Sequence, residues 1–292
     1  MTHSPIGCHA LVWTGTFDEA GIRSSAERTR RAGFDMIEYP LMDPFAFDAG
    51  VARAAVADNG LLVSASLGLA EATDISSEDT SVVAAGEALL RRAVEVTHEM
   101  GGGQLCGVLY SAMRKYLAPA SEKGLAHSRE VIGRVAEYGA SVGVSLALEV
   151  VNRYETNILN TGRQALAYLG ELGRDDVAVH LDTYHMNIEE SDMSAPVLDC
   201  ADRLGYVHIG ESHRGYLGTG SVDFDGFFKA LGRAGYTGPV VFESFSSAVV
   251  SPTLSNTLGI WRNLWDDGDD LGAHANAYIR GALRAVETIE LH

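Results

Sequence analysis

Short apolar runs recur along the whole chain, each followed by a segment of helical pattern. Eight of these runs are rich in Val, Ile, Leu and aromatic residues and have the length of buried strands. The predicted strands are Ile6–Trp13, Phe34–Tyr39, Leu61–Leu67, Gln104–Leu109, Val144–Val150, Val177–Asp182, Gly205–Ile209 and Pro239–Glu243. Nearly continuous runs of this kind favour parallel strands, which are buried on both faces.

Between the runs, apolar residues recur every three or four positions, as one buried face of a helix requires. From residue 79 to 100 they stand at positions 82, 85, 89, 93, 96 and 100. Further helices are predicted at Glu19–Arg31, Ala46–Asn59, Ser121–Ala140, Arg163–Leu172, Phe224–Arg233 and Asn256–Thr288. Gly33 and Gly60 follow the first two of these and suit C-terminal caps.

Strict alternation of eight strands with helices predicts an α/β fold, a single (β/α)8 TIM barrel over residues 1–292, with its active site at the C-terminal ends of the strands. No linker rich in Pro, Ser or Gly divides the chain. An open doubly wound sheet is the alternative. Its marker, a G-x-G-x-x-G turn after the first strand, is absent, because that turn reads Thr14-Gly15-Thr16-Phe17.

Charge and composition narrow the possible partners. The formal net charge is −17, from 22 basic and 39 acidic residues, which disfavours nucleic acid and anionic membranes. We find no signal-peptide pattern and no apolar run of membrane-spanning length, so a soluble, cytoplasmic protein is expected. Cys8, Cys106 and Cys200 are too few and too widely spaced for a disulfide framework or a Cys-x-x-Cys zinc site.

Four of the predicted strands in the second half of the chain end at a residue that can bind metal. These residues are Glu149, Asp182, His208 and Glu243, spaced by 33, 26 and 35 positions. Each spacing is about one strand-loop-helix-loop unit, so the four side chains are expected to meet at one mouth of the barrel. Because strand residues alternate sides, an inward Glu149 also places Ala147 inside.

Any one of these residues, taken alone, reads as a capped or ion-paired side chain at a strand end. Three carboxylates gathered at one mouth, however, repel one another and need a cation. With one imidazole they form a hard, mainly oxygen ligand set. Such a set is typical of Mn²⁺, Mg²⁺ or Co²⁺ rather than of a closed tetrahedral Cys/His zinc site.

Other chemistry-bearing features are weaker. The loops after these strands carry polar residues that, taken alone, are typical of solvated loops. The glycine-rich segment 215–220 could cradle a phosphate. None of the three lysines ends a strand, which argues against a Schiff-base aldolase. Trp261 and Trp265, four positions apart on the predicted last helix, indicate packing rather than sugar stacking.

Four stretches resemble the D-tagatose 3-epimerase family, which includes the D-psicose (D-allulose) 3-epimerases and L-ribulose 3-epimerases. They read LALEVVNRYETN (146–157), HLDTYHMNIEE (180–190), YVHIGESHRGYLGTGSVDF (206–224) and VVFESF (240–245). The resemblance implies that Glu149, Asp182, His208 and Glu243 bind the metal and that Glu149 and Glu243 are also the catalytic acid and base. It also implies one divalent metal per subunit, with Mn²⁺ expected and Co²⁺ or Mg²⁺ as alternatives, and a homodimer or homotetramer.

By the same resemblance Glu155, His185 and Arg214 bind the substrate. Trp13, Tyr110 and Phe245 are candidate walls of the distal pocket. Tyr110-Ser111-Ala112-Met113 departs from the family, many of whose members have a tryptophan in this region. The preferred ketose therefore stays open among D-fructose/D-psicose, D-tagatose/D-sorbose and L-ribulose/L-xylulose.

The implied reaction interconverts free ketoses at C3. Loss of the C3 hydrogen beside the C2 carbonyl gives an enediolate that a cation stabilises, and a second carboxylate reprotonates the opposite face. The nearest alternative is an aldose–ketose or hydroxypyruvate isomerase on the same barrel. A metal-dependent apurinic-site endonuclease conflicts with the acidic charge, and a non-catalytic sugar-binding protein would not need both glutamates.

Overall fold

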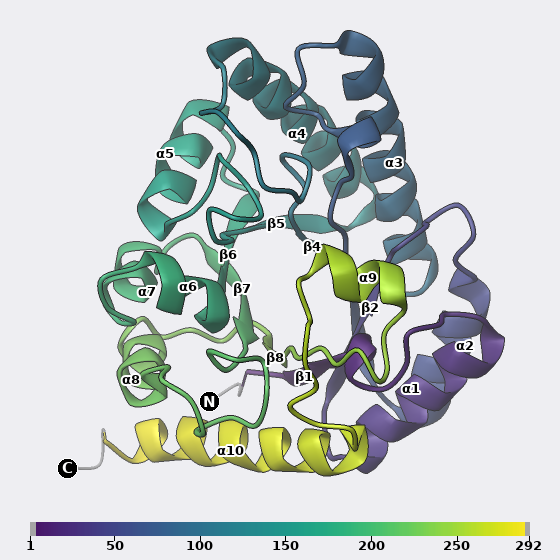
Figure 1. The fold of residues 1–292 in the computed structure, drawn as a ribbon, viewed down its shortest axis with the longest axis vertical. Helices are drawn as coiled ribbons and strands as arrows, with labels where there is room; N and C mark the ends of the chain where they lie inside the picture. The colour runs from purple at the N-terminus through teal and green to yellow at the C-terminus, as the bar shows by residue number, and fades with distance from the viewer. Residues whose placement is uncertain (1–3, 290–292) are drawn as a thin grey trace.

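The eight strands of the computed structural model, which describes residues 4–289, form a closed barrel in which each strand runs parallel to the next (Figure 1). The strands are β1 (Ile6–His9), β2 (Met36–Pro40), β3 (Leu62–Ser66), β4 (Gln104–Gly107), β5 (Ser145–Glu149), β6 (Val177–Asp182), β7 (Leu204–Ile209) and β8 (Val240–Phe242). Pairing of β8 with β1 closes the ring. The predicted TIM barrel is confirmed.

Most helices lie outside the barrel between successive strands, and the last two follow β8 (Figure 1). The helices are α1 (Glu19–Arg31), α2 (Ala49–Asn59), α3 (Thr80–Glu99), α4 (Glu122–Val142), α5 (Gly162–Leu172), α6 (Thr183–Glu189), α7 (Ala195–Asp199), α8 (Phe224–Arg233), α9 (Pro252–Thr257) and α10 (Gly268–Ile289). Two 3₁₀ turns cover Ala10–Val12 and Glu71–Thr73. Gly60 caps α2 with a left-handed φ of 61°, as its position in the sequence predicted.

The first predicted strand was too long. β1 ends at His9, whose ring accepts a hydrogen bond from the Leu11 amide and caps a 3₁₀ turn over Ala10–Val12. The turn is buried like the strand before it, so hydropathy alone did not separate the two.

The single helix predicted over Asn256–Thr288 was also wrong. α9 ends near Gly259, which has a φ of 66°, and α10 begins only at Gly268, where the Asp267 carboxylate accepts the amide of Asp269. Trp261 and Trp265 therefore lie in a connecting segment rather than on a helix. Trp265 is buried and donates its indole N–H to Ser244, whereas Trp261 is 77% exposed.

Most of the buried side chains form two zones separated by the sheet. The larger zone lies between the strands and the outer helices. The smaller one fills the barrel itself and contains Met36, Cys106, Ala147, Tyr206 and Val241. Ala147 thus lies inside the barrel, as the alternation along β5 predicted.

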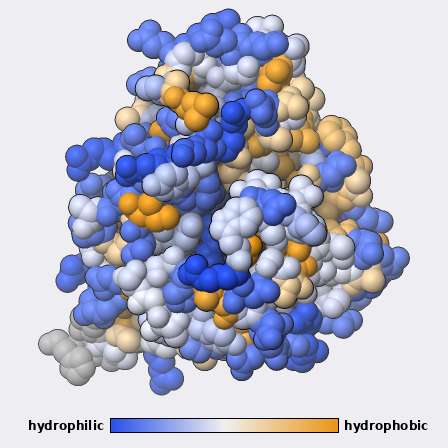
Figure 2. All heavy atoms as spheres, in the orientation of Figure 1, coloured by the Kyte–Doolittle hydropathy of each residue, from blue (hydrophilic) through white to orange (hydrophobic). Residues whose placement is uncertain are grey.

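The segment that carries α9 packs against the β1 and β8 side of the barrel. Val250 and Leu254 form a small apolar cluster with Leu11 and Phe245, and Figure 1 shows this segment in front of the strands. The face seen in Figure 2 is mainly hydrophilic, with apolar residues scattered over it. Within residues 4–289, no helix combines the length and hydropathy needed to cross a bilayer.

Candidate metal and active site

The structure brings the four predicted strand-end residues together around one atom. His208 Nδ1 lies 3.7 Å from Glu149 Oε1, 3.8 Å from Asp182 Oδ2 and 3.4 Å from Glu243 Oε1. All four side chains are buried or nearly so. Three carboxylates thus face one imidazole nitrogen at the C-terminal end of the barrel.

The strand register explains this convergence. Asp182 pairs with His208 across β6 and β7, and Glu149 pairs with His180 one step along the ring. Residues at the same level on parallel strands point to the same side, so Asp182 and His208 both face the barrel axis. Asp182 also ends β6 and caps α6, because one carboxylate oxygen accepts the amides of Tyr184 and His185.

The residues fit a divalent cation. Asp182 Oδ2 and His208 Nδ1 are buried and have no hydrogen-bond partner among the described residues, although each faces the other ligand candidates. Asp182, His208 and Glu243 form one group whose ligand atoms are mutually within 4.8 Å. Glu149, Asp182 and His185 form another. Carboxylate oxygens with one imidazole suit Mn²⁺, Co²⁺ or Mg²⁺ by donor type.

Burial and mutual repulsion shift the pKa values of the side chains in this cluster. Burial raises the pKa of Glu149 to about 8, and burial with the nearby Glu243 charge raises the pKa of Asp182 to about 7. Burial opposes protonation of His208, but the charges of Glu38 and Glu243 raise its pKa well above the usual value. The site without a cation therefore holds protons that a bound cation would displace.

Two residues that the sequence reasoning missed lie beneath this cluster. Glu38 on β2 is fully buried, and its Oε2 accepts from His208 Nε2 at 2.8 Å. His9 at the end of β1 lies 3.4 Å from Glu38 Oε1 and packs edge-on against the His208 ring. A charged residue within the apolar run Phe34–Tyr39 was the available signal, since a buried carboxylate requires a partner.

Arg214 reaches the cluster from the loop after β7. Its guanidinium donates to Glu243 Oε2 at 2.5 Å and lies over the rings of Tyr184 and Phe245, at 3.9 and 4.7 Å from their centroids. Arg214 has a φ of 57°, and among the described residues it alone combines a positive φ with a side chain. The Ser244 hydroxyl donates to its carbonyl and holds this conformation.

The glycine-rich segment 215–220 surrounds an anion of the chain itself. The buried Glu211 carboxylate accepts the amides of Ser212 at 2.7 Å, Gly218 at 2.9 Å and Val222 at 3.3 Å. A Cβ at Gly220 would overlap this carboxylate. The Glu211 carboxylate thus occupies the group of amides that the sequence pattern suggested as a phosphate-binding site.

His185 and Glu155 are joined through Asn152. The Asn152 amide donates to His185 Nδ1 at 3.1 Å, and its side-chain nitrogen donates to Glu155 Oε1 at 2.9 Å. Burial lowers the pKa of His185, so the ring is neutral, and acceptance at Nδ1 places its proton on Nε2. That Nε2 lies 3.8 Å from Glu149 Oε1 and 3.5 Å from an Arg214 nitrogen.

The three residues expected as pocket walls have different positions. Phe245 lies at the site, against His9 and Arg214. Tyr110 is buried and donates its hydroxyl hydrogen to the Glu149 carbonyl at 2.7 Å, so Tyr110 holds the end of β5. Trp13 points away from the carboxylate cluster, toward α1 and α10. Its indole donates to Thr29 on α1, and its ring fills the space where Gly272 of α10 has no side chain.

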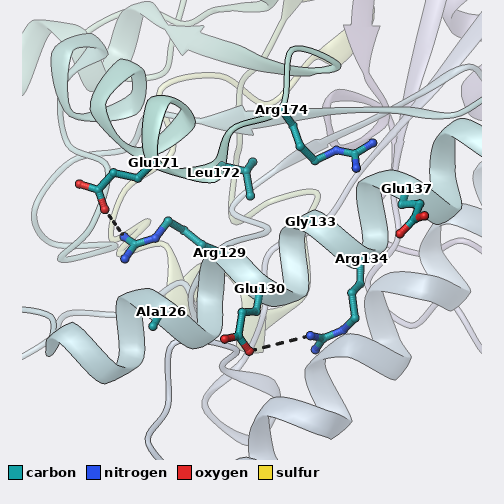
Figure 3. A pocket seen from close by; sticks show the side chains of 9 residues that line it. All are labelled: Ala126, Arg129, Glu130, Gly133, Arg134, Glu137, Glu171, Leu172 and Arg174. Atoms are coloured by element: carbon teal, nitrogen blue, oxygen red, sulfur yellow. Dashed lines mark ion pairs between the residues drawn. The ribbon is translucent and has the colours of Figure 1, made fainter.

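A surface hollow of about 600 Å³ lies elsewhere, between α4 and α5 (Figure 3). Three arginines line it, and each has a carboxylate partner: Arg129 pairs with Glu171, Arg134 with Glu87, and Arg174 with Asp176. These pairs leave no unpaired arginine to bind an anion. The hollow lies on the helical layer and contains none of the predicted site residues.

Comparison with known proteins identifies the family to which this fold belongs. Residues 26–266 match the family described as the xylose isomerase-like TIM barrel. The chain is 67% identical to a ketose 3-epimerase of Arthrobacter globiformis, over 98% of this chain and 99% of that protein. It is 53% identical to an L-ribulose 3-epimerase of Methylomonas sp., over 94% and 96% of the two chains.

A solved structure is similar over nearly the whole length. The D-allulose 3-epimerase of Methylomonas sp., crystallised in complex with D-allulose, shares 51% identity and superposes with a TM-score of 0.94. The similarity covers 97% of this chain and 98% of that one. This chain therefore belongs to the xylose isomerase-like TIM-barrel family and, within it, to the ketose 3-epimerases, which are isomerases.

Proposed function

We propose that this protein is a metal-dependent epimerase of free ketoses at C3, acting by proton transfer between two carboxylates. Candidate pairs are D-fructose/D-psicose (D-allulose), D-tagatose/D-sorbose and L-ribulose/L-xylulose. One observation carries the proposal: Glu149 at the end of β5 and Glu243 directly after β8 approach the same histidine nitrogen in a ketose 3-epimerase chain. Two other strands separate β5 from β8 around the ring, so the carboxylates come from different sides.

Glu149, Asp182, His208 and Glu243 would hold one divalent cation, with Mn²⁺ expected and Co²⁺ or Mg²⁺ as alternatives. Their donor atoms and the unpartnered Asp182 Oδ2 and His208 Nδ1 support this assignment. When bound, the cation supplies positive charge next to the oxygens on which an enediolate carries its negative charge.

The two glutamates would move the proton. One carboxylate removes the C3 hydrogen, which is acidic because the C2 carbonyl lies beside it, and the other carboxylic acid returns a proton to the opposite face. The roles exchange in the reverse direction. Both side chains are buried, so the protons are held away from bulk solvent.

Three further residues would orient the sugar. The Nε2–H of His185 and the Arg214 guanidinium both face the glutamates and can donate to substrate oxygens. Glu155 would accept from a hydroxyl or orient His185 through Asn152. An unphosphorylated substrate is supported because Glu211 already occupies the glycine-rich cradle. Phe245 forms part of the wall beside them.

Single glutamate variants test the two-base scheme. Glu149→Gln and Glu243→Gln should abolish epimerisation, yet each should still exchange the C3 hydrogen of one epimer with deuterated water, since one base remains. The two variants should exchange opposite epimers. Bound Mn²⁺ is measured in parallel, and Glu137→Gln, an exposed change on α4, serves as control. Near wild-type epimerisation by either variant would show that the scheme is wrong.

The position of the label separates the epimerase from an isomerase on the same barrel. Deuterium at C3 supports epimerisation, whereas deuterium at C1 or C2 supports an aldose–ketose isomerase. D-fructose, D-tagatose, L-ribulose and their phosphates are compared with Mn²⁺ and with EDTA. Activity that persists in EDTA would remove the metal from the proposal.

A further inference from the structure

Glu38 is a fully buried carboxylate in the interior of the barrel, and its neighbours fix its orientation. Its Oε2 accepts from the Tyr206 hydroxyl at 2.6 Å and from His208 Nε2 at 2.8 Å. Tyr206 is itself hydrogen-bonded to Ser64 at 2.7 Å. His9 Nε2 approaches the other oxygen, Oε1, at 3.4 Å. Two hydrogen bonds at Oε2 and the His9 contact at Oε1 restrict the rotamers of this side chain before any ligand binds.

The bond between Glu38 and His208 decides which nitrogen of that ring faces the carboxylate cluster. A neutral imidazole carries one proton, and the nitrogen that donates it cannot also offer a lone pair. Because Nε2 is committed to Glu38, Nδ1 is the nitrogen that can offer its lone pair to a cation. Nδ1 is the atom that lies 3.4 to 3.8 Å from Glu149, Asp182 and Glu243.

Fold stability alone does not account for Glu38. The barrel interior around it also contains Tyr206, Met36 and Cys106, and an apolar side chain would pack there without the cost of desolvating a charge. Glu38 also adds a fourth carboxylate to the three above it, which increases their repulsion. With a cation bound at the cluster, the Glu38 charge would instead attract the cation and stabilise the site.

We propose that Glu38 is a positioning residue for the metal centre. It holds His208 with Nε2 protonated and Nδ1 directed at the ligand cluster, and its charge strengthens His208 as a donor. The inference rests on the proposed metal-dependent function, since it concerns the ligand that the function requires. Outer carboxylates bonded to ligand histidines typically affect metal affinity by about 10- to 100-fold.

Calorimetric titration of the metal-free protein with Mn²⁺ tests this role without measuring turnover. We expect Glu38→Gln, which keeps the shape and one acceptor but removes the charge, to weaken binding about 10-fold, and Glu38→Ala about 100-fold. The matched control is Tyr206→Phe. It removes the other hydrogen bond to the same oxygen but leaves the Glu38–His208 bond, so its loss of affinity should be smaller than that of either variant.

A spectroscopic readout follows the His208 ring itself. In ¹⁵N-histidine-labelled protein loaded with diamagnetic Mg²⁺, the wild-type His208 signals should show a protonated Nε2 and an unprotonated Nδ1. Glu38→Ala should shift or broaden these signals, whereas Tyr206→Phe should leave the protonation pattern unchanged. A protonated Nδ1 in the Mg²⁺-loaded wild-type protein would overturn the proposal even if no Glu38 variant folded.

The outcomes separate this inference from the proposed function. Mn²⁺ binding that is tight in wild type and unchanged in both Glu38 variants would overturn the positioning role and leave the metal site intact. A wild-type protein that binds neither Mn²⁺ nor Co²⁺ would overturn the metal-dependent function and, with it, this inference. Equal losses for Glu38→Gln and Tyr206→Phe would indicate a general packing effect and would also overturn the positioning role.

Discussion

Replacing Arg214 with alanine should destabilise the metal-free protein strongly and the metal-loaded protein less. The guanidinium is 12% exposed, donates to Glu243 at 2.5 Å and stacks on Tyr184 and Phe245. In the metal-free protein, the Arg214 guanidinium is the positive group that reaches Glu243 from the loop after β7. A bound cation would take over part of that compensation.

The size of the effect follows from the buried ion pair. Two unit charges about 4 Å apart attract by about 4 kcal/mol at an effective dielectric constant near 20. Removing one partner of a buried pair typically costs about 3–5 kcal/mol, because the other charge is left buried. For a chain of this size that corresponds to a fall in Tm on the order of 10 °C. Burial would raise the pKa of Glu243, but His208 and Arg214 hold it below its usual value. The variant should therefore raise that pKa.

Metal binding should show the opposite trend from activity. Without the Arg214 charge, the ligand cluster is more repulsive when empty and gains more from a cation. Each 1.4 kcal/mol by which Mn²⁺ reduces the cost of Arg214→Ala must appear as tenfold tighter Mn²⁺ binding. We expect a gain of about tenfold. Because a charge-assisted bond to substrate is lost, kcat/KM should still fall about 10- to 100-fold.

The assay combines thermal unfolding in EDTA and in excess Mn²⁺ with calorimetric Mn²⁺ titration. Arg23→Ala is the control, since Arg23 is 42% exposed and pairs with Glu19, which is 67% exposed, on the same helix. Its effect should stay within about 1 kcal/mol with or without metal. Weaker Mn²⁺ binding by Arg214→Ala, or equal destabilisation in EDTA and Mn²⁺, would refute the reasoning.

Two further predictions concern the same cluster. Gly220→Ala places a Cβ against the Glu211 carboxylate, so it should lower the unfolding free energy by about 1–3 kcal/mol. It should also lower kcat/KM, because it displaces the loop that carries Arg214. Urea denaturation and kinetics that match wild type would contradict this prediction. Because the raised pKa values of Glu149 and Asp182 leave protons on the metal-free site near neutral pH, Mn²⁺ affinity should rise from pH 6 to 8. Calorimetry in buffers of different ionisation enthalpy should detect proton release, and a pH-independent affinity would contradict the assignment.

Local pattern was sufficient for most of the fold because β/α units repeat one simple rule. Buried parallel strands must be apolar along their length, and the helices between them must be amphipathic. The helix predicted at Glu19–Arg31 has those bounds in the structure, and the one at Phe224–Arg233 does too. The errors fell where a turn is as buried as a strand, at Ala10–Val12, and where Gly259 interrupts a helical pattern.

The sequence by itself also identified Glu149, Asp182, His208 and Glu243 as a group, because each ends an apolar run and spacings of 26 to 35 residues, about one β/α unit, bring strand ends together in a barrel. Only the tertiary structure placed Glu38 under His208, since β2 and β7 are far apart in sequence and meet across the barrel interior. It also put Glu211 inside the glycine-rich loop and turned Trp13 toward α1 and α10. Side-chain direction across a closed barrel depends on register and packing between distant segments, which hydropathy along one segment does not contain.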